Sequence, residues 1–563
     1  MRTFQHMSSR RMVAAALFAA VASSAMADAT DTTMWIASGG GTYGLPGSWD
    51  NGVPGPTINA VFDLGNASTY TVDFAADGTA YDLYLHGGNV TWAMASHNLS
   101  LTNNFFLGFL DGDTASLQVG GGAFSSIFGD VAHLAGTNAT LTLSGSGAAW
   151  NNSMDITVGR EGTGTLTVQN GATMTLGRDI YVGNQGGDGT LLVTGGSSSF
   201  TASDGLLFVA VLTSASTQAH GQATITDGAT ASFGHQAAIG DGGIGTLTVS
   251  AGATLYTNKS TSGSGSSGIL GVNAGPGQYG DGTATVTGSG SQWIQDGSLA
   301  VGFTGKGTLT VSAGGELSTD MGHIARRSGS SGTATITGTN SKWGIANSLY
   351  VGGEAGAAGG TGSLTVASGG LVTVGQRLEL WDSGTVDVTG GGALTVGSGS
   401  SAAGEVRLYT GGTLAGTGSI TGTLRNLGGT ITPGHSPGTL TADVADLSSG
   451  TLVMDITGTA PGAYDVLAVT DTMTLGGTLN IVFSGGFAPQ TGDTFPLFSG
   501  PASPAGAFDT VNVLGIEPGW GYEFVPTSGG LQLHSLSDGT VPEPVGLALV
   551  VLGLGLLVRR RSA

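Results

Sequence analysis

The sequence predicts an all-β protein built as a right-handed parallel β-helix, a solenoid in which the chain winds through successive coils of short strands. Three observations predict this fold: a strand-like phrase that recurs every 24 to 37 residues, a second phrase within each recurrence, and 105 glycines among 563 residues. A repeat of this length is typical of a solenoid or array, whose units stack to bury a shared core. Length alone would allow several domains, but the repeat favours one elongated body.

The first phrase places a leading Gly before alternating aliphatic and Thr residues, as in Gly164-Thr165-Leu166-Thr167-Val168. Its other copies begin at Gly189, Gly221, Gly245, Gly282, Gly307, Gly332 and Gly362. A period of two with β-branched residues predicts a strand with one buried face. We expect the aliphatic residues to stack inward coil over coil. The Thr side chains are expected to point outward and to hydrogen-bond between coils.

The second phrase ends on Gly, as in Asp155-Ile156-Thr157-Val158-Gly159 and Ser298-Leu299-Ala300-Val301-Gly302. Two or three strands of about four residues, with turns, fill a unit of roughly 28 residues, whereas a propeller blade needs about 40 to 45. The spaced Leu and Asn of a leucine-rich repeat are absent. Gly at the ends of both phrases is expected to supply turns with positive φ. A parallel β-helix is the fold that remains. Connections between parallel strands of one sheet are almost always right-handed, and by extension of this rule we expect a right-handed coil.

The composition excludes several functional classes. The chain has no Cys, which excludes disulfides and thiol chemistry. The net charge is −21, and all 37 acidic residues lie between Asp28 and Glu543. The segment between the two terminal arginine groups holds 10 basic residues against those 37, a net charge of −27. Nucleic acid and anionic membrane surfaces are therefore poor partners, whereas divalent cations are compatible with such a body.

Residues 1–27 have the features of a secretory signal peptide. Arg2, Arg10 and Arg11 form a basic region, and residues 12–21 form a short apolar run. Ala25-Met26-Ala27 is a small-residue cleavage site, with Ala25 and Ala27 as its recognition residues. This order predicts export through the general secretion translocon. The Arg10-Arg11 pair leaves a twin-arginine signal as the alternative.

The remaining chain divides by its pattern. Residues 28–75 are predicted to form an N-terminal β cap that covers the open end of the solenoid. Residues 76–440 are predicted to form the parallel β-helix, and residues 441–535 a β-rich C-terminal module with longer strands and more aromatic residues. Within the coils, Asp111-Gly112-Asp113 resembles a calcium turn. A solvated Asx turn is favoured, because no further carboxylates follow at ligand spacing.

Three Trp residues follow small-residue turns at equivalent places in their coils: Trp150, Trp293 and Trp343. One interpretation is a ladder of rings that stacks sugars. The other is a set of rings that cover coil corners. Because the three residues are scattered over almost 200 residues, they are too far apart for one binding groove, and the second interpretation is favoured.

Residues 536–563 carry the most specific signal. The motif Pro542-Glu543-Pro544 precedes fourteen uncharged residues, Val545 to Val558, and then Arg559-Arg560-Arg561. Fourteen helical residues span about 21 Å, short of the roughly 30 Å hydrocarbon core of a bilayer. A terminal apolar run has nothing left to pack against, so we predict one short transmembrane helix. The three Arg are expected to stop it at the cytoplasmic face of the inner membrane.

Together, Pro542-Glu543-Pro544, the apolar run and the Arg triplet resemble the PEP-CTERM sorting signal of Gram-negative bacteria. The resemblance implies recognition by an exosortase, a membrane protease, at the Pro-Glu-Pro motif. It also implies a cell-surface or matrix destination linked to exopolysaccharide. The coils are similar to autotransporter passenger repeats, and residues 429–440 resemble a passenger-associated transport repeat.

An enzyme is the competing expectation, because polysaccharide lyases and hydrolases also use β-helices. Hydrolases need paired carboxylates facing one groove. The strands here consist mostly of Thr, Ser, Ala and Val, and the nine His are scattered without a ligand pair. The sequence thus predicts no catalytic residues, no metal site and no cofactor, apart from weak calcium signals. Uniform Thr and Ser faces would favour a structural or adhesin-like protein. Three converging carboxylates with an Arg would favour a polysaccharide-binding or polysaccharide-degrading protein.

Overall fold

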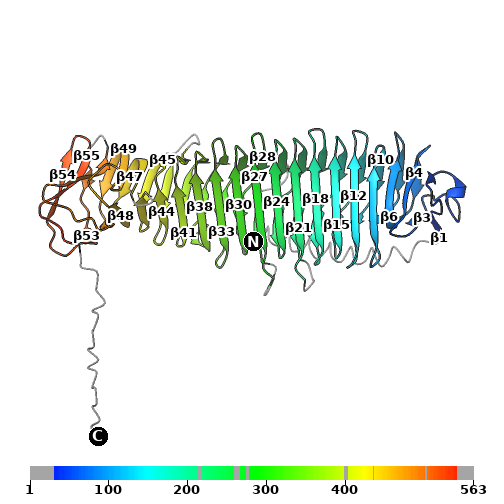
Figure 1. Ribbon diagram of the computed structural model, residues 1–563, viewed down its shortest axis with the longest axis horizontal. Helices are drawn as coiled ribbons and strands as arrows, with labels where there is room; N and C mark the ends of the chain where they lie inside the picture. The colour runs from blue at the N-terminus through cyan, green and yellow to red at the C-terminus, as the bar shows by residue number, and fades with distance from the viewer. Residues whose placement is uncertain are drawn as a thin grey trace, which may run out of the picture.

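The protein is an all-β parallel solenoid of about 17 turns, drawn out into a rod (Figure 1). The computed structural model describes residues 31–212, 217–258, 267–273, 275, 278–397, 404–434, 437–500 and 504–541. Within these ranges the helical content is one short 3-10 turn, η1 (Pro46–Ser48). The predicted parallel β-helix is confirmed, and its right hand stays a prediction.

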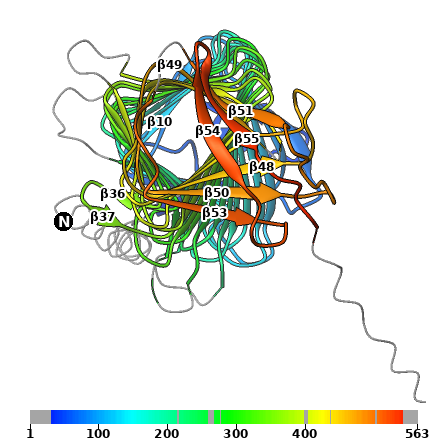
Figure 2. The same ribbon diagram turned by 90° about the vertical axis from the view of Figure 1, so that its left-hand side faces the viewer.

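Each regular coil contributes three strands, which form three faces around one core when the rod is viewed along its axis (Figure 2). The long-strand face consists of β9 (Thr114–Val119), β12 (Asn138–Ser144), β15 (Thr163–Gln169), β18 (Asp188–Thr194), β21 (His220–Thr226), β24 (Ile244–Ser250), β27 (Asp281–Thr287), β30 (Lys306–Ser312), β33 (Ser331–Thr337), β38 (Thr361–Ala367), β41 (Gly384–Val388) and β44 (Thr413–Gly416).

The middle face follows each long strand after a tight turn. It consists of β10 (Ala123–Ser126), β13 (Ala149–Asn152), β16 (Thr173–Leu176), β19 (Ser199–Ala202), β22 (Thr230–Phe233), β25 (Thr254–Thr257), β28 (Gln292–Gln295), β31 (Glu316–Thr319), β34 (Lys342–Ile345), β39 (Leu371–Val374) and β42 (Ala393–Val396). Every strand pairs in parallel with its equivalent one coil later, as β13 does with β16.

The third face closes each coil. It consists of β8 (Phe105–Leu107), β11 (Gly129–Val131), β14 (Ile156–Val158), β17 (Ile180–Asn184), β20 (Leu207–Val211), β23 (Ala237–Asp241), β26 (Gly268–Val272), β29 (Leu299–Val301), β32 (Gly322–Ile324), β35 (Leu349–Val351), β40 (Arg377–Leu380) and β43 (Glu405–Leu408). The longer strand β45 (Ser419–Asn426) pairs with both β42 and β43 and so continues two faces at once.

The register of the long-strand face reproduces the sequence repeat residue by residue. Leu166 pairs with Leu191, and both are fully buried. The Thr residues between the aliphatic ones point outward, as predicted. The predicted hydroxyl bonds between coils are found at the ends of these strands, from Ser250 to Thr226 and from Ser312 to Thr287, each at 3.0 Å. Burying the aliphatic file of every coil supplies the main stabilisation of the rod.

The glycines of the two phrases serve different purposes, and this corrects the expectation of positive φ at both. The second-phrase glycines adopt it, with φ of 68° at Gly159 and 76° at Gly302. The first-phrase glycines do not. At Gly307, a side chain would collide with the backbone of Val301 and Gly302 in the same coil. Gly is required there because two backbone segments approach closely, not because of a left-handed turn.

At the N-terminal end the described chain joins the solenoid immediately. Strand β1 (Asp31–Met34) pairs in parallel with β3 (Ile58–Asp63). The ring of Trp49 lies 5.1 Å from Trp35, 5.3 Å from Tyr43 and 5.3 Å from Phe62, measured between centroids. These buried aromatic rings fill the interior of the first coil.

The C-terminal part, predicted as a module from residue 441, largely continues the parallel ladder. Strand β47 (Thr439–Leu447) pairs in parallel with β49 (Val466–Leu475), and β48 (Thr451–Ile456) pairs with β50 (Thr478–Phe483), which pairs with β53 (Thr510–Leu514). Antiparallel pairing links β51 (Thr494–Ser499) to β55 (Gly530–Ser535), and β55 to β54 (Tyr522–Thr527). This antiparallel part covers the end of the rod (Figure 2).

Several predicted features lie outside the described residues: the signal peptide with Ala25 and Ala27, the motif Pro542-Glu543-Pro544, the apolar run 545–558 and Arg559-Arg560-Arg561. The short transmembrane helix is therefore not observed. Among the residues that the structure does describe, none belongs to an apolar helix of the length that a bilayer crossing requires.

Candidate functional site

The three turn-following Trp residues are buried in the core. Trp150, Trp293 and Trp343 are each 0% exposed. Their indole Nε1 atoms donate to hydroxyls on the preceding coil, namely Ser126 at 3.0 Å, Thr257 at 2.8 Å and Thr319 at 3.1 Å. The rings are thus unavailable for stacking on sugars, and they pack inside the coils rather than over their corners.

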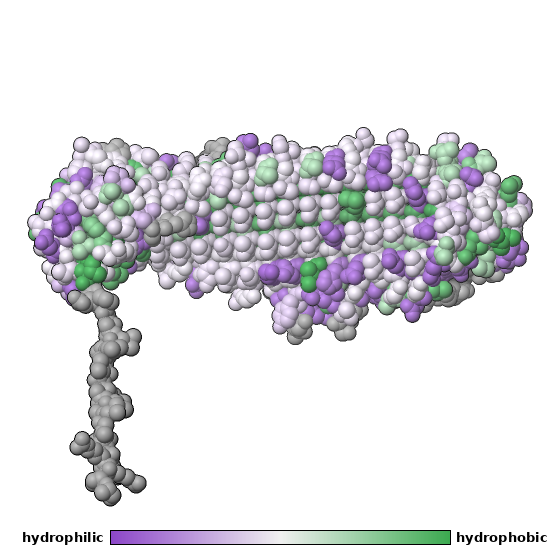
Figure 3. All heavy atoms as spheres, viewed as in Figure 1, coloured by the Kyte–Doolittle hydropathy of each residue, from purple (hydrophilic) through white to green (hydrophobic). Residues whose placement is uncertain are grey.

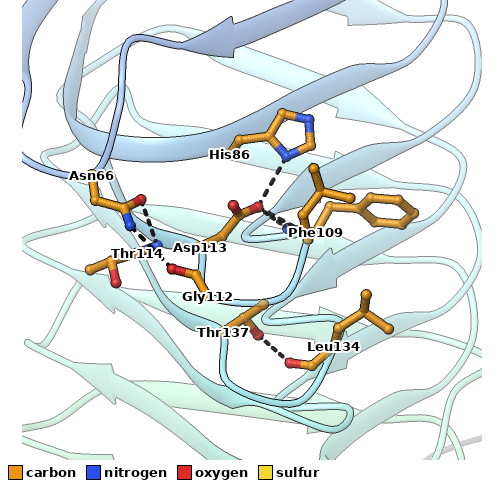
Figure 4. Close-up of polar contacts among 9 residues, drawn as sticks. Asn66, His86, Phe109, Gly112, Asp113, Thr114, Leu134 and Thr137 are labelled. Atoms are coloured by element: carbon orange, nitrogen blue, oxygen red, sulfur yellow. Dashed lines mark hydrogen bonds and ion pairs between the residues drawn. The ribbon is translucent and has the colours of Figure 1, made fainter.

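The Asp111-Gly112-Asp113 turn uses its second carboxylate within the protein (Figure 4). Oδ2 of Asp113 accepts the backbone N–H groups of Phe109 at 3.0 Å and Leu110 at 2.8 Å. The same oxygen lies 3.0 Å from Nδ1 of His86. These bonds run back to residues four and three positions before Asp113, whereas an Asx turn bonds the backbone two residues ahead, and the side chain is only 13% exposed. The solvated Asx turn that the sequence favoured is therefore not what the structure shows at Asp113. Within the described residues, no group of three or more His, Asp or Glu is arranged to hold a metal ion.

Buried carboxylates at the start of the third face bond along the rod. Asp155 Oδ1 accepts the N–H of Asp179 at 3.0 Å, and Asp179 Oδ1 accepts the N–H of Leu206 at 2.9 Å. Nearer the N-terminus, Asp82 Oδ1 accepts the N–H of Asn104 at 2.8 Å. Burial raises the pKa of Asp82 to about 6, against the lowering effect of that backbone bond. These acids thus accept backbone N–H groups of the following coil.

Arg326 and Arg327, which are adjacent in the sequence, are held by contacts from neighbouring coils. Both guanidinium groups pair with Glu354 of the short hairpin β36 (Gly353–Glu354), Arg326 at 2.9 Å. Both also lie over the ring of Phe303, at 5.4 and 5.7 Å from its centroid. Sequence reasoning missed these contacts because the partners lie in neighbouring coils, beyond the reach of local pattern.

A charged file follows the outer side of the third face where β40, β43, β45 and β47 meet. The register aligns Glu379 with Arg407, Arg407 with Arg425, and Arg425 with Asp446. Nitrogen–oxygen distances are 3.9 Å for Arg407–Glu379, 3.6 Å for Arg425–Glu405 and 3.4 Å for Arg425–Asp446, and Arg407 also pairs with Glu405. This charged file brings three carboxylates and two Arg together from coils that no local sequence pattern links.

The acidic and basic side chains of the charged file stabilise each other's charged forms against the effect of burial. Burial raises the pKa of Glu379, which is 7% exposed, although Arg407 and Arg377 oppose the rise. Burial opposes the charge on Arg407, but its hydrogen bonds to Glu405 and Tyr409 raise its pKa above the ordinary value. The ring of Tyr409 stacks on Trp381 at 4.2 Å, beside these charges. The site can therefore hold a polar ligand only by competing with its own ion pairs.

The long-strand face carries an ordered set of hydroxyls. Two outward files run along five consecutive strands, and we call them together the hydroxyl array: Thr246, Thr283, Thr308, Thr333 and Ser363 in one file, and Thr248, Thr285, Thr310, Thr335 and Thr365 in the other. In Figure 3 this face shows even rows of side chains of intermediate hydropathy along the rod, and the strongly hydrophilic residues gather toward its lower edge.

Comparison with known proteins adds no relative. No protein-family model matches the chain, and no curated protein matches it. The fold alone defines the class, an all-β parallel solenoid.

Proposed function

We propose that the protein is an exported structural or adhesin-like β-solenoid of the cell surface or extracellular matrix, sorted by an exosortase and linked to exopolysaccharide. The observation that carries this proposal is the uniform hydroxyl array on a rigid rod. A surface of this kind repeats one neutral contact along its whole length, which suits multivalent attachment better than chemistry at a single point.

The delivery route rests on the sequence. A leader ending at Ala27 would direct the chain through the translocon, and Pro542-Glu543-Pro544 would present the exosortase with its motif once Arg559-Arg560-Arg561 had stopped transfer. The strongly acidic body supports an extracellular destination, because it avoids nonspecific contact with anionic surfaces on the way. The anchor is short and marginal, as suits a segment that is removed.

The experiment is an intact-mass measurement of the protein recovered from its native host, with peptide mapping of both ends. We expect a chain that begins at Asp28 and ends near Pro542 to Pro544. In a matched variant with Glu543→Ala, the mass should retain the C-terminal segment. A wild-type chain that still carries Arg559 to Arg561 would overturn the exosortase proposal and leave a membrane-tethered protein.

One observation favours a second candidate, a polysaccharide-binding or polysaccharide-degrading protein. The charged file gathers Glu379, Glu405 and Asp446 around Arg407 and Arg425, the kind of convergence that such an activity needs. Incubation with acidic and neutral polysaccharides, followed by assay of new reducing or unsaturated ends, tests it. Activity that disappears in Glu405→Gln but survives in Glu316→Gln, an exposed residue of the middle face, would establish the enzyme and displace the structural proposal.

A further inference from the structure

The hydroxyl array is unusually regular. Its five strands, β24 to β38, pair without a register shift, so equivalent hydroxyls differ by one coil along the rod. Parallel strands lie about 4.8 Å apart, and residues two apart in a strand are about 6.6 Å apart. Each position is therefore a point in a two-dimensional lattice fixed by the backbone. The array is a property of the fold and is independent of any sorting signal.

The support beneath the array is rigid. The inward neighbours of the array residues are aliphatic and fully buried: Leu247, Val249, Ala284, Val286, Leu309, Val311, Ala334, Ile336, Leu364 and Val366. The array residues themselves are half-buried, apart from the exposed Thr333. β-Branched Thr has few rotamers in a strand, so a close-packed core below it also fixes the hydroxyl and methyl positions above it.

The array hydroxyls are free to bond outward. The hydroxyls at the ends of these strands, next to the array, bond within the protein, as Ser312 does to Thr287 at 3.0 Å. Across the described part of the chain, by contrast, no array hydroxyl bonds to another protein group. Each can donate one hydrogen bond and accept more, and its partner is whatever meets the face.

Charge and shape narrow the choice of that partner. No array position is charged, although the body of the chain is strongly acidic. Charges border the array at two places: Asp387 lies beside Thr365 on the next strand of the same face, and at the strand starts Lys306 pairs with Asp281 at 2.9 Å. The array also holds no aromatic ring for a sugar to stack on and no side chain that bonds a sugar bidentately. A neutral partner with its own regular lattice of hydrogen-bonding oxygens fits best.

We propose that the hydroxyl array binds ice. The oxygen atoms at an ice surface repeat in two dimensions at distances comparable to the strand spacing and to the two-residue spacing along a strand. Each hydroxyl takes the place of one water in that lattice, and each Thr methyl excludes disordered water beside it. The neutral face complements a neutral surface, whereas ionic groups would hold water in the wrong orientation. The ten array residues are held on one rigid face, so their contacts form together. Binding then does not lose conformational entropy separately at each side chain.

The test uses the purified exported chain, slow freezing onto an ice surface, and microscopy of ice recrystallisation. We expect the wild-type protein to enter the ice and to slow recrystallisation. The double variant Thr285→Lys with Thr310→Lys, at the centre of the array, should lose at least ten-fold in both measurements. The matched control is Thr201→Lys with Thr373→Lys, two half-buried outward Thr on the middle face, and it should retain both.

Folding of each variant is checked separately by circular dichroism and melting temperature. A further variant, Thr285→Val, removes one hydroxyl of the array while it keeps the shape of the side chain. A wild-type chain that is excluded from ice, or a control that loses as much as the array variant, would overturn the proposal. Array-dependent binding to an insoluble neutral polysaccharide, with no effect on ice, would also overturn it. None of these results bears on the intact mass, so failure here and failure of the sorting proposal remain distinguishable.

Discussion

The indole Nε1 of Trp343 donates a hydrogen bond to Oγ1 of Thr319 across two neighbouring coils, at 3.1 Å, inside a core where the ring is 0% exposed. The same link joins Trp293 to Thr257 at 2.8 Å. A large ring would otherwise bury its N–H without a partner, so the hydroxyl of the preceding coil makes the ring tolerable there. The contact fixes the position of one coil against the next.

Trp343→Ala should therefore destabilise the rod. Loss of a buried Trp costs about 3–5 kcal/mol through lost packing and the cavity left behind. Thr319→Val keeps the shape but leaves the indole N–H unpaired, at a cost of about 1–3 kcal/mol. Urea unfolding followed by circular dichroism measures both. If Trp343→Ala left unfolding unchanged but weakened polysaccharide binding, the buried placement of the ring would be wrong.

Gly307→Ala should also destabilise, for a steric reason. The added methyl would meet the backbone of Val301 and Gly302, which cannot move aside as a flexible side chain would. Such overpacking costs about 1–3 kcal/mol. The control is Gly120→Ala, where nothing lies within 4 Å of the added methyl and the change should stay within about 0.5 kcal/mol. Equal unfolding midpoints for the two variants would contradict the close approach.

Asp82→Asn should make the protein more stable at high pH. The folded-state pKa of Asp82 is about 6, above its unfolded value, so the stability that this carboxyl contributes at low pH is lost as pH rises through 6. Asn59 and Asn104 occupy the equivalent positions one coil to each side, so Asn fits. The variant should gain about 2 kcal/mol over wild type between pH 4 and pH 8.

Melting temperatures at the two pH values measure this difference. Asp63→Asn, at an exposed position of β3, is the control and should show no comparable change. A constant difference between Asp82→Asn and wild type across the pH range would mean that Asp82 titrates alike in the folded and unfolded chain.

Arg407→Met should weaken the C-terminal coils in a pH-dependent way. Removing this guanidinium leaves the buried carboxylate of Glu379 without the Arg that lowers its pKa most, at a cost of about 1–2 kcal/mol at pH 7. The pKa of Glu379 then rises further, so the deficit should shrink as pH falls and the carboxyl takes up a proton. Arg377→Met, whose side chain is 52% exposed, should cost less than about 0.5 kcal/mol.

Urea unfolding at pH 7 and pH 4.5 separates the two Arg variants. Hydrogen exchange in β40 and β43 then locates the effect. If Arg407→Met and Arg377→Met behaved alike at both pH values, the charged file would be an exposed surface pattern rather than a partly buried network.

The parts of the fold that sequence could predict are those that depend on local alternation. Leu166 and Val168 point inward because a strand alternates sides at every residue, whichever coil it belongs to. The packing of Trp343 was harder to predict, since a ring after a tight turn fits either inside or outside a coil. The alignment of Glu379 with Arg407, and of Arg407 with Arg425, was not predictable. The intervals of 28 and 18 residues differ from coil to coil, so the register is known only once the turns are known.

The antiparallel cover at the C-terminal end has a mechanical consequence. A force that pulls on this end meets the pairing of β51 with β55 before it reaches any parallel coil. Once that cover has unfolded, each coil is held chiefly by the next coil. The rod would therefore unfold one coil at a time. A coil of about 25 residues releases roughly 80 Å of chain. If the protein tethers a cell, as proposed, the tether would lengthen in successive steps under load, each set by the length of its coil, instead of breaking at once.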